Sequence, residues 1–361
     1  MALSTARYKL KAVCGLFASR DKVMKVQRQH PKGAQMNNLV TIYGGSGFVG
    51  RYIAQRMAKE GWRVRVAVRH PNEALFVKPY GAVGQVEPVL CNIRNDASVR
   101  AAAKGADVVV NCVGLLVQSG KNRFDVVQAE GAGRIARIAQ EEGVARMVHL
   151  SAIGADAQSK SKYARSKAQG EALVLASFPQ AMILRPSVLF GNEDQFFNRF
   201  AAMSRMGPIL PLVGAETLFQ PAYVGDVAKA AGLGILGIAA GGIYELGGPE
   251  VASFRTLMQQ MLVVIERKRL ILNIPHFIAR LMAFGFDALQ LLSGGLIMNP
   301  AVTQDQLINL SKDNVVSPTA KGFGDLGISP ATISAVLPEY MWQYRPSGQY
   351  AAIKGSAKNL R

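Results

Sequence analysis

The chain of 361 residues has only three cysteines, Cys14, Cys91 and Cys112. They are too few and too far apart for a disulfide framework or a cysteine-based metal site, so no metal is expected. Cys91 and Cys112 each end an apolar run. We therefore expect them to be buried free thiols in a protein of a reducing compartment.

Long apolar runs are also missing. A membrane-spanning helix needs about 18 or more uninterrupted apolar residues. The longest candidate, HFIARLMAFGFDALQLLSGGLIM, is interrupted by Arg280 and Asp287. We expect either a core helix or a helix that lies against a membrane, because Arg267, Lys268 and Arg269 precede it.

Acidic residues are scarce, with 24 Asp and Glu against 42 Lys and Arg, which gives a net charge of +18. The electrostatic field of a protein with this net charge attracts polyanions. Aromatic residues make up only 7% and no nucleic-acid motif is present, so an anionic membrane surface or an acidic protein partner is expected and nucleic acid is not. Residues 1–36 are predicted to be a basic, flexible leader, with a targeting segment as the alternative, and residues 346–361 a basic tail.

From Leu39 to Gly191, short apolar runs rich in β-branched residues alternate with amphipathic segments. This pattern predicts βαβ units and a parallel sheet covered on both faces. We predict an α/β fold with a Rossmann-type doubly wound parallel sheet in residues 37–191, joined by segments that return from 220–248. Residues 192–345 are predicted to form a smaller, mostly helical lobe for docking to a partner or membrane, in which only IYELGG has the pattern of a strand.

A glycine-rich turn, YGGSGFVGR, joins the first predicted strand to a helix. Its glycines fit both G-x-G-x-x-G and the G-x-x-G-x-x-G spacing of short-chain dehydrogenases. Glycines permit the tight turn and bring the backbone close to a pyrophosphate, which the helix N-terminus attracts. The predicted cofactor contacts here are Gly44, Gly45, Ser46, Gly47, Phe48, Val49, Gly50 and Arg51.

The second predicted strand ends at Arg69. Nucleotide-binding units usually carry an acidic residue there, about 20 positions past the glycines, to hold a ribose hydroxyl. A guanidinium suits a 2′-phosphate instead, through paired charge-assisted hydrogen bonds, so NADPH is the predicted cofactor, with Arg51 as a possible second cation. Asn92 and Ile93 are predicted to border the adenine. Cys112, Val113 and Gly114 are predicted to flank the nicotinamide ribose.

Tyr163 and Lys167 are four residues apart on one face of a predicted helix. In short-chain dehydrogenases this spacing makes the tyrosine a general acid or base whose pKa the lysine lowers. The lysine also serves nucleotide binding alone, so the pair does not establish turnover. Ser151 is the only candidate for the usual serine partner in HLSAIGAD.

Five segments carry a closer resemblance: VTIYGGSGFVGRYI, NEALFVKPYGAVGQVEPVLCNIRND, ILRPSVLFGNEDQFFNRFA, FQPAYVGDVAKA and TQDQLINLSKDNVVS. Over about Asn37 to Glu339 the chain resembles the nucleotide-binding accessory subunit of respiratory complex I, an atypical extended short-chain dehydrogenase. The resemblance implies one tightly held NADPH, no turnover of its own, and a role in assembling or stabilising the proton-pumping NADH:quinone oxidoreductase near its quinone-reducing junction. Its partners would be other subunits of that complex.

The resemblance assigns the cofactor to Gly44, Gly47, Gly50, Arg69, Asn92 and Lys167, and we add Pro186 and Val188 from RPSVLF. The expected location is peripheral, on the cytoplasmic face of a bacterial inner membrane or, alternatively, on the matrix face of the mitochondrial inner membrane. Two other functions stay open. One is an active NADP-dependent oxidoreductase or epimerase that uses Tyr163 and Lys167, and the other is a sensor of the NADPH redox state.

Overall fold

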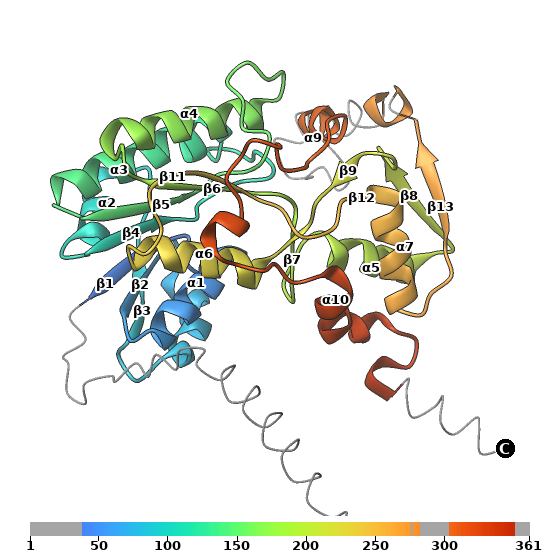
Figure 1. Cartoon of the computed structure of the whole chain (residues 1–361), viewed down its shortest axis with the longest axis horizontal. Coiled ribbons are helices and arrows are strands. Elements are labelled where there is room, and N and C mark those ends of the chain that lie inside the picture. The colour runs from blue at the N-terminus through green and yellow to red at the C-terminus, as the bar shows by residue number, and fades with distance from the viewer. Residues whose placement is uncertain (1–37, 276, 282–302, 351–361) are drawn as a thin grey trace, which may run out of the picture. The chain divides into compact units, whose positions relative to one another are not determined.

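The centre of the chain is a seven-stranded parallel β-sheet, seen in a computed structural model that describes residues 38–275, 277–281 and 303–350 (Figure 1). The strand order is β11-β6-β5-β4-β1-β2-β3. The bounds are β1 (Leu39–Tyr43), β2 (Arg63–Val68), β3 (Val86–Leu90), β4 (Val108–Asn111), β5 (Arg146–Leu150), β6 (Met182–Pro186) and β11 (Gly242–Leu246). The predicted leader, most of the apolar segment from residue 276 and most of the basic tail lie outside the described residues.

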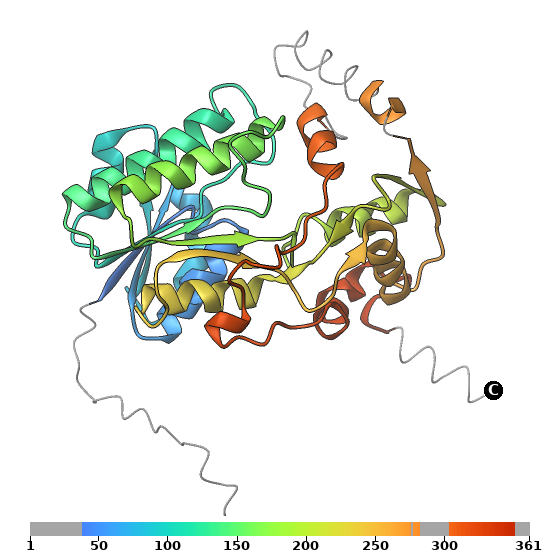
Figure 2. The same cartoon turned by 45° about the horizontal axis from the view of Figure 1, so that its top comes forward.

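Helices cover both faces of this sheet, as the alternation of segments predicted. One face packs against α1 (Phe48–Lys59), η1 (Pro71–Tyr80) and α6 (Val224–Ile235). The other packs against α2 (Asp96–Ala103), α3 (Gly131–Glu141) and α4 (Lys162–Ser177), and a π-helical turn, η2 (Asp125–Glu130), leads into α3. Figures 1 and 2 show the two layers on either side of the strands. The central strands β1 and β4 are buried throughout, whereas the edge strand β3 is largely accessible. A core covered on both faces is typical of a doubly wound sheet.

The register brings the functional loops to one edge of the sheet. Tyr43 pairs with Ala67 of β2 and with Asn111 of β4, so the three strands end level with one another. The glycine turn, the end of β2 and the loop after β4 therefore meet at the carboxyl edge. This is the edge at which open parallel sheets bind ligands.

A second hydrophobic core belongs to the lobe. Six phenylalanines form an aromatic cluster within it: Phe190, Phe196, Phe197, Phe200, Phe219 and Phe254. The helices are α5 (Phe197–Met206), α7 (Phe254–Val264), α9 (Gln304–Leu310) and α10 (Ile333–Met341). Short 3₁₀ turns complete the lobe at η3 (Gly324–Leu326), η4 (Trp342–Tyr344) and η5 (Gly348–Tyr350).

The lobe contains more strands than expected. β8 (Ile209–Val213) pairs in parallel with β13 (Leu270–Ile274), which we had expected to be helical. Two-residue ladders join β7 (Leu189–Phe190) to β10 (Ala222–Tyr223) and β9 (Leu218–Phe219) to β12 (Ala252–Ser253). These pairings are long-range, so a single short segment shows no periodicity that reveals them. Within the described ranges, no helix combines the length and the apolar character that crossing a bilayer requires.

Candidate nucleotide-binding site

A groove of ≈ 240 Å³ opens at the carboxyl edge of β1, β2, β3 and β4. It is formed by the loops that follow these strands, and the chain thereby brings together segments up to 83 positions apart in sequence, from Gly44 to Val127. Its walls are Gly44, Ser46, Gly47, Ala67, Val68, Arg69, Cys91, Asn92, Ile93, Arg94, Cys112, Val113, Gly114, Leu115, Asn122 and Val127.

The glycines of the turn have separate physical roles. Gly44 has a left-handed φ of +73°, and a Cβ there would lie 3.2 Å from Val113. A Cβ on Gly50 would lie 2.4 Å from the Gly44 carbonyl oxygen, so Gly50 allows α1 to approach the turn closely. Gly47 caps α1 and faces solvent. No acidic residue occupies the first turn of α1, which leaves its amides and partial positive charge to an anion.

Two arginines, and no acidic side chain, line the groove. Arg69 follows β2 and is exposed, and no described acidic residue pairs with it. Arg94, which we did not predict, follows β3, and its Nη1 donates to the Lys121 carbonyl at 3.3 Å. The sequence signal that could have identified Arg94 is its position, two residues after the predicted site residue Asn92.

Arg51, predicted as the second cation, does not line the groove. Its Nη2 donates to the Ser46 carbonyl at 3.0 Å and its Nη1 lies 3.5 Å from Glu193 Oε1. The guanidinium carbon also lies 4.7 Å from the centroid of the Phe76 ring. Contacts within the protein thus occupy the Arg51 guanidinium, and the second cation that lines the groove is Arg94.

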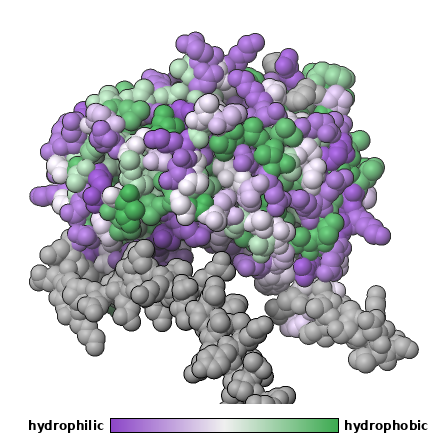
Figure 3. Space-filling view, viewed as in Figure 1, coloured by the Kyte–Doolittle hydropathy of each residue, from purple (hydrophilic) through white to green (hydrophobic). Residues whose placement is uncertain are grey.

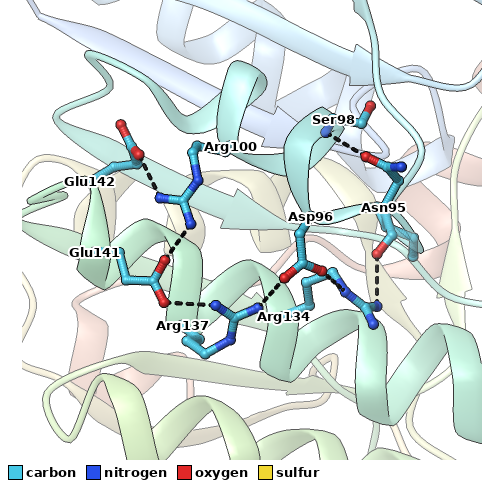
Figure 4. A network of polar contacts seen from close by, with 9 residues as sticks. Asn95, Asp96, Ser98, Arg100, Arg134, Arg137, Glu141 and Glu142 are labelled. Carbon is cyan, nitrogen blue, oxygen red and sulfur yellow. Dashed lines mark hydrogen bonds and ion pairs between the residues drawn. The ribbon is translucent and has the colours of Figure 1, made fainter.

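An ionic network between α2 and α3 holds the loop that follows β3 (Figure 4). Asp96 accepts from Arg134 Nε at 2.6 Å and from Arg137 Nη2 at 2.5 Å, and these bonds lower its pKa. Arg134 Nη1 also donates to the Ile93 carbonyl at 3.1 Å, inside the groove-lining segment. The network continues through Arg100, Glu141 and Glu142, and Asn95 caps α2 by accepting from Ser98 N.

The loop after β4 is fixed from the sheet side. Asn111 Oδ1 accepts from Val113 N at 3.0 Å, and Asn111 Nδ2 lies 3.1 Å from Nδ1 of the buried His149 on β5. Behind this wall lies Lys167 of α4, whose Nζ would be 3.5 Å from a Cβ on Gly114. Burial lowers the Lys167 pKa to about 8, and its ammonium donates to the Leu150 carbonyl at 3.1 Å.

Tyr163 lies beside Lys167, with its ring centroid 6.0 Å from Nζ, as the four-residue spacing implies. Burial, together with the charge of Asp305, raises the Tyr163 pKa to about 12. Asp305 comes from α9 and accepts from the backbone amides of Lys162 and Tyr163 at 2.6 and 3.2 Å. Figures 1 and 2 show α9 close to the end of α4. The Ser151 hydroxyl is buried without a hydrogen-bond partner among the described residues, so no Ser151–Tyr163 bond forms here.

The groove lining contains nine of the predicted cofactor residues and leaves eight out. Gly45 is buried in the turn, Gly50 is buried in α1, and Lys167 lies behind Gly114. Phe48, Val49, Arg51, Pro186 and Val188 complete the set that does not line it. The residues that sequence reasoning missed are Ala67, Val68, Cys91, Arg94, Leu115, Asn122 and Val127. Apart from Arg94 they are uncharged: Ala67 and Val68 end β2, Val127 lies in η2, and the others are loop residues. None of them carries a sequence signal for nucleotide binding.

Comparison with known proteins gives this groove a cofactor class. Residues 44–204 match a family model described as NAD(P)H-binding. The match begins at the glycine turn and spans all the loops that line the groove. The chain therefore contains a domain for a nicotinamide nucleotide.

Relatives of known name cover most of the chain. A mitochondrial NADH dehydrogenase [ubiquinone] 1 alpha subcomplex subunit 9 from Arabidopsis thaliana is 34% identical, over 86% of this chain and 79% of the relative. The mitochondrial NADH-ubiquinone oxidoreductase 40 kDa subunit of Neurospora crassa is 28% identical, over 98% and 92%. The crystal structure of Thermus thermophilus UDP-glucose 4-epimerase with NAD shares the fold, with a TM-score of 0.61 at 17% identity, over 86% and 99%. The chain belongs to the family of NADH dehydrogenase [ubiquinone] 1 alpha subcomplex subunit 9.

Proposed function

We propose that this protein holds NADPH, in preference to NADH, as a permanently bound cofactor. The observation that carries the proposal is the charge of the groove, which has Arg69 and Arg94 on its walls and no acidic side chain. A carboxylate at the end of β2 would repel a 2′-phosphate, whereas a guanidinium binds it through two parallel hydrogen bonds. Lys167, buried behind Gly114, would bind the ribose next to the nicotinamide.

The bound nucleotide would not be turned over. A tyrosine that transfers a proton near neutral pH needs a lowered pKa. Burial and Asp305 move the pKa of Tyr163 in the opposite direction, and Ser151 makes no bond to its hydroxyl. In this proposal the nucleotide acts by linkage: it binds only the folded chain and so stabilises it, by about 4 kcal/mol at 1,000 times its Kd.

The stabilised fold would serve as an accessory subunit of a proton-pumping NADH:quinone oxidoreductase. Support comes from the relatives, whose names make them subunits of NADH dehydrogenase [ubiquinone] and of NADH-ubiquinone oxidoreductase. The partners would be other subunits of that complex, near its quinone-reducing junction. The location would be the cytoplasmic face of a bacterial inner membrane or the matrix face of the mitochondrial inner membrane, and the relatives named mitochondrial support the second.

The lobe would dock against those subunits and against anionic lipid. Ile209 of β8 and Leu270 of β13 are register partners, and both are exposed. Leu272 and, one helical turn apart, Phe277 and Leu281 extend this apolar surface. Exposed cations lie in the same segments, at Arg205, Lys268 and Arg280. Figure 3 shows hydrophobic side chains in patches among hydrophilic ones on the face seen in Figure 1. Each cation near an anionic membrane contributes about 1 kcal/mol of binding.

Identifying the nucleotide tests the cofactor half of the proposal. The purified full chain is denatured, and the released nucleotide is identified by chromatography and mass. We expect NADPH or NADP⁺ at close to one per chain. Release of NAD(H) alone, or of no nucleotide, would overturn the assignment.

One observation favours a second function, an NADP-dependent oxidoreductase or epimerase: Tyr163 and Lys167 do lie side by side on α4. The variant Tyr163→Phe separates the two functions. An accessory subunit keeps its NADPH and still assembles, whereas an enzyme loses its turnover. A redox sensor is the third possibility and requires a large difference in affinity between NADPH and NADP⁺, which calorimetry measures directly.

A further inference from the structure

A second and larger cavity, of ≈ 480 Å³, lies between the loop after β4 and the N-terminal half of α4. This volume is typical of small-molecule sites. Its walls are Gln118, Ser119, Gly120, Arg123, Phe124, Asp125, Lys162, Arg165, Ser166 and Gln169. No residue lines both this cavity and the nucleotide groove, so the second cavity is a separate site.

The charges in this cavity do not cancel. Arg123 forms an ion pair with Asp125, which removes one cation and the only acidic side chain of the lining. The Lys162 ammonium pairs with no described acidic residue, and Arg165 uses Nη1 to donate to the Ser159 carbonyl at 2.6 Å. Lys162 and the rest of the Arg165 guanidinium, both exposed, therefore line the same cavity with positive charge that no acidic side chain of the lining neutralises.

The anion would be held by side chains and not by the end of α4. The first amides of this helix are already satisfied, because Asp305 accepts from Lys162 N and Tyr163 N while Ser161 Oγ accepts from Ala164 N. Lys162 and Arg165 are three positions apart and thus share a helix face. Ser166 and Gln169 continue that face with polar groups.

We propose that this cavity binds a small molecule through a phosphate or carboxylate group, held between Lys162 and Arg165. Arginine recognises both groups with two parallel hydrogen bonds, and lysine adds a point charge. The remaining walls are polar apart from the buried ring of Phe124, so the body of the ligand would be polar with one flat apolar contact.

Phe124 separates this ligand from Tyr163. The two rings are edge to face with their centroids 5.7 Å apart, and Tyr163 itself does not line the cavity. The bound molecule is consequently a ligand and not a substrate for hydride transfer at Tyr163. The site is independent of the proposed nucleotide specificity, because it shares no wall with the groove.

Calorimetry on the full chain tests the proposal with inorganic phosphate as the probe. The chain is first saturated with NADPH, and the fluorescence of the bound nucleotide verifies this, so that phosphate cannot enter the groove. At constant ionic strength we expect one saturable phosphate site. The variants Lys162→Glu and Arg165→Glu should each lower the affinity for phosphate at least tenfold. Lys104→Glu, at an exposed lysine after α2, should change that affinity less than twofold. Lys162→Glu is the safer variant for folding, because its ammonium has no described acidic partner.

Two outcomes overturn the proposal: no saturable binding of phosphate or of anionic vesicles by the wild type, or an equal loss in Lys104→Glu. Binding to phosphatidylglycerol vesicles but not to free phosphate, reduced by Lys162→Glu, supports the site and identifies a lipid headgroup as the source of the anion. Phosphatidylcholine vesicles are the uncharged control. If the chain does not load with NADPH, that failure counts against the nucleotide proposal alone. Phosphate binding is then judged by the difference between the wild type and Lys162→Glu.

Discussion

The charge reversal Arg69→Asp should convert the preference for NADPH into a preference for NADH. Arg69 lines the groove at the end of β2 and is exposed, and no described acidic residue competes for its guanidinium. A hydrogen bond to a charged group contributes about 1.5–3 kcal/mol. Because solvent screens an exposed arginine, we take the lower part of this range, and a carboxylate 4 Å from the phosphate adds about 1 kcal/mol of repulsion per charge. With one to two charges on the 2′-phosphate, the sum of about 2.5–3.5 kcal/mol predicts an NADPH affinity lower by about 60- to 300-fold.

The affinity for NADH should change much less, by less than about threefold, because its ribose offers a 2′-hydroxyl that a carboxylate accepts. Calorimetric titration of both nucleotides into nucleotide-free protein measures the two ratios. Arg63→Asp is the matched control, since Arg63 is an exposed arginine at the opposite end of the same strand. Equal losses for NADPH and NADH, or an equal effect of Arg63→Asp, would refute the assignment of Arg69 to the 2′-phosphate.

Three further predictions concern the turn and α4. Gly50→Ala should lower the free energy of unfolding by about 1–3 kcal/mol in chemical denaturation, because its Cβ would lie 2.4 Å from the Gly44 carbonyl oxygen. Gly47→Ala should lower it less, because the Cβ would lie 3.1 Å from the same oxygen at the exposed N-cap, and it should weaken NADPH binding. Lys167→Met should stabilise the nucleotide-free chain at pH 7 by up to about 3 kcal/mol, since burial lowers the lysine pKa from 10.5 to about 8. Between these two pKa values the unfolded chain keeps the Lys167 proton that the folded chain has lost, so the free energy of unfolding of the wild type rises with pH from about 8 to 10.5. The gain in stability from Lys167→Met should therefore shrink over this range. An equal gain at pH 7 and at pH 10 would contradict this. Asp305→Ala should cost about 1–2 kcal/mol in thermal unfolding, because two α4 amides lose their acceptor, and no loss would contradict that capping role.

The sheet and the glycine turn were predictable because their signals are local. β1 is an apolar run, in β2 Val64 and Val66 alternate with Arg63 and Arg65, and the glycines between the two strands have a fixed spacing that backbone geometry demands. Fold class and cofactor class follow from such signals. The position of Arg69 at the groove was predictable for the same reason, because the end of β2 follows the glycine turn at a known distance in sequence.

The motifs of the lobe were recognisable as sequence, but their physical role was not. The buried Asp194 of GNEDQFF accepts from the Tyr340 hydroxyl at 2.6 Å and from backbone amides of its own loop. Asn314 of LSKDNVVS accepts from Val188 N at 3.1 Å. Both bind segments more than 100 positions away, as Asp305 does at α4. Contacts of this range depend on the tertiary fold, and no local pattern predicts them.

Contacts with other side chains explain why Arg51 does not line the groove. Its position at the start of α1 suggested a phosphate contact, but Glu193 and Phe76 bind its guanidinium. Arg94 was overlooked because the loop after β3 has no regular pattern. Which of several cations near a predicted site is available depends on the neighbours that the fold supplies, and sequence spacing alone does not contain that information.

Native electrophoresis of gently solubilised membranes tests the central claim most directly, with immunoblotting for this chain beside an in-gel stain for NADH oxidation. The account predicts that the wild type and Tyr163→Phe both co-migrate with a very large NADH-oxidising band. Migration of the wild type at the size of a monomer or dimer, in a gel where that large band is intact, would contradict it and would direct the search toward a substrate for Tyr163 and Lys167.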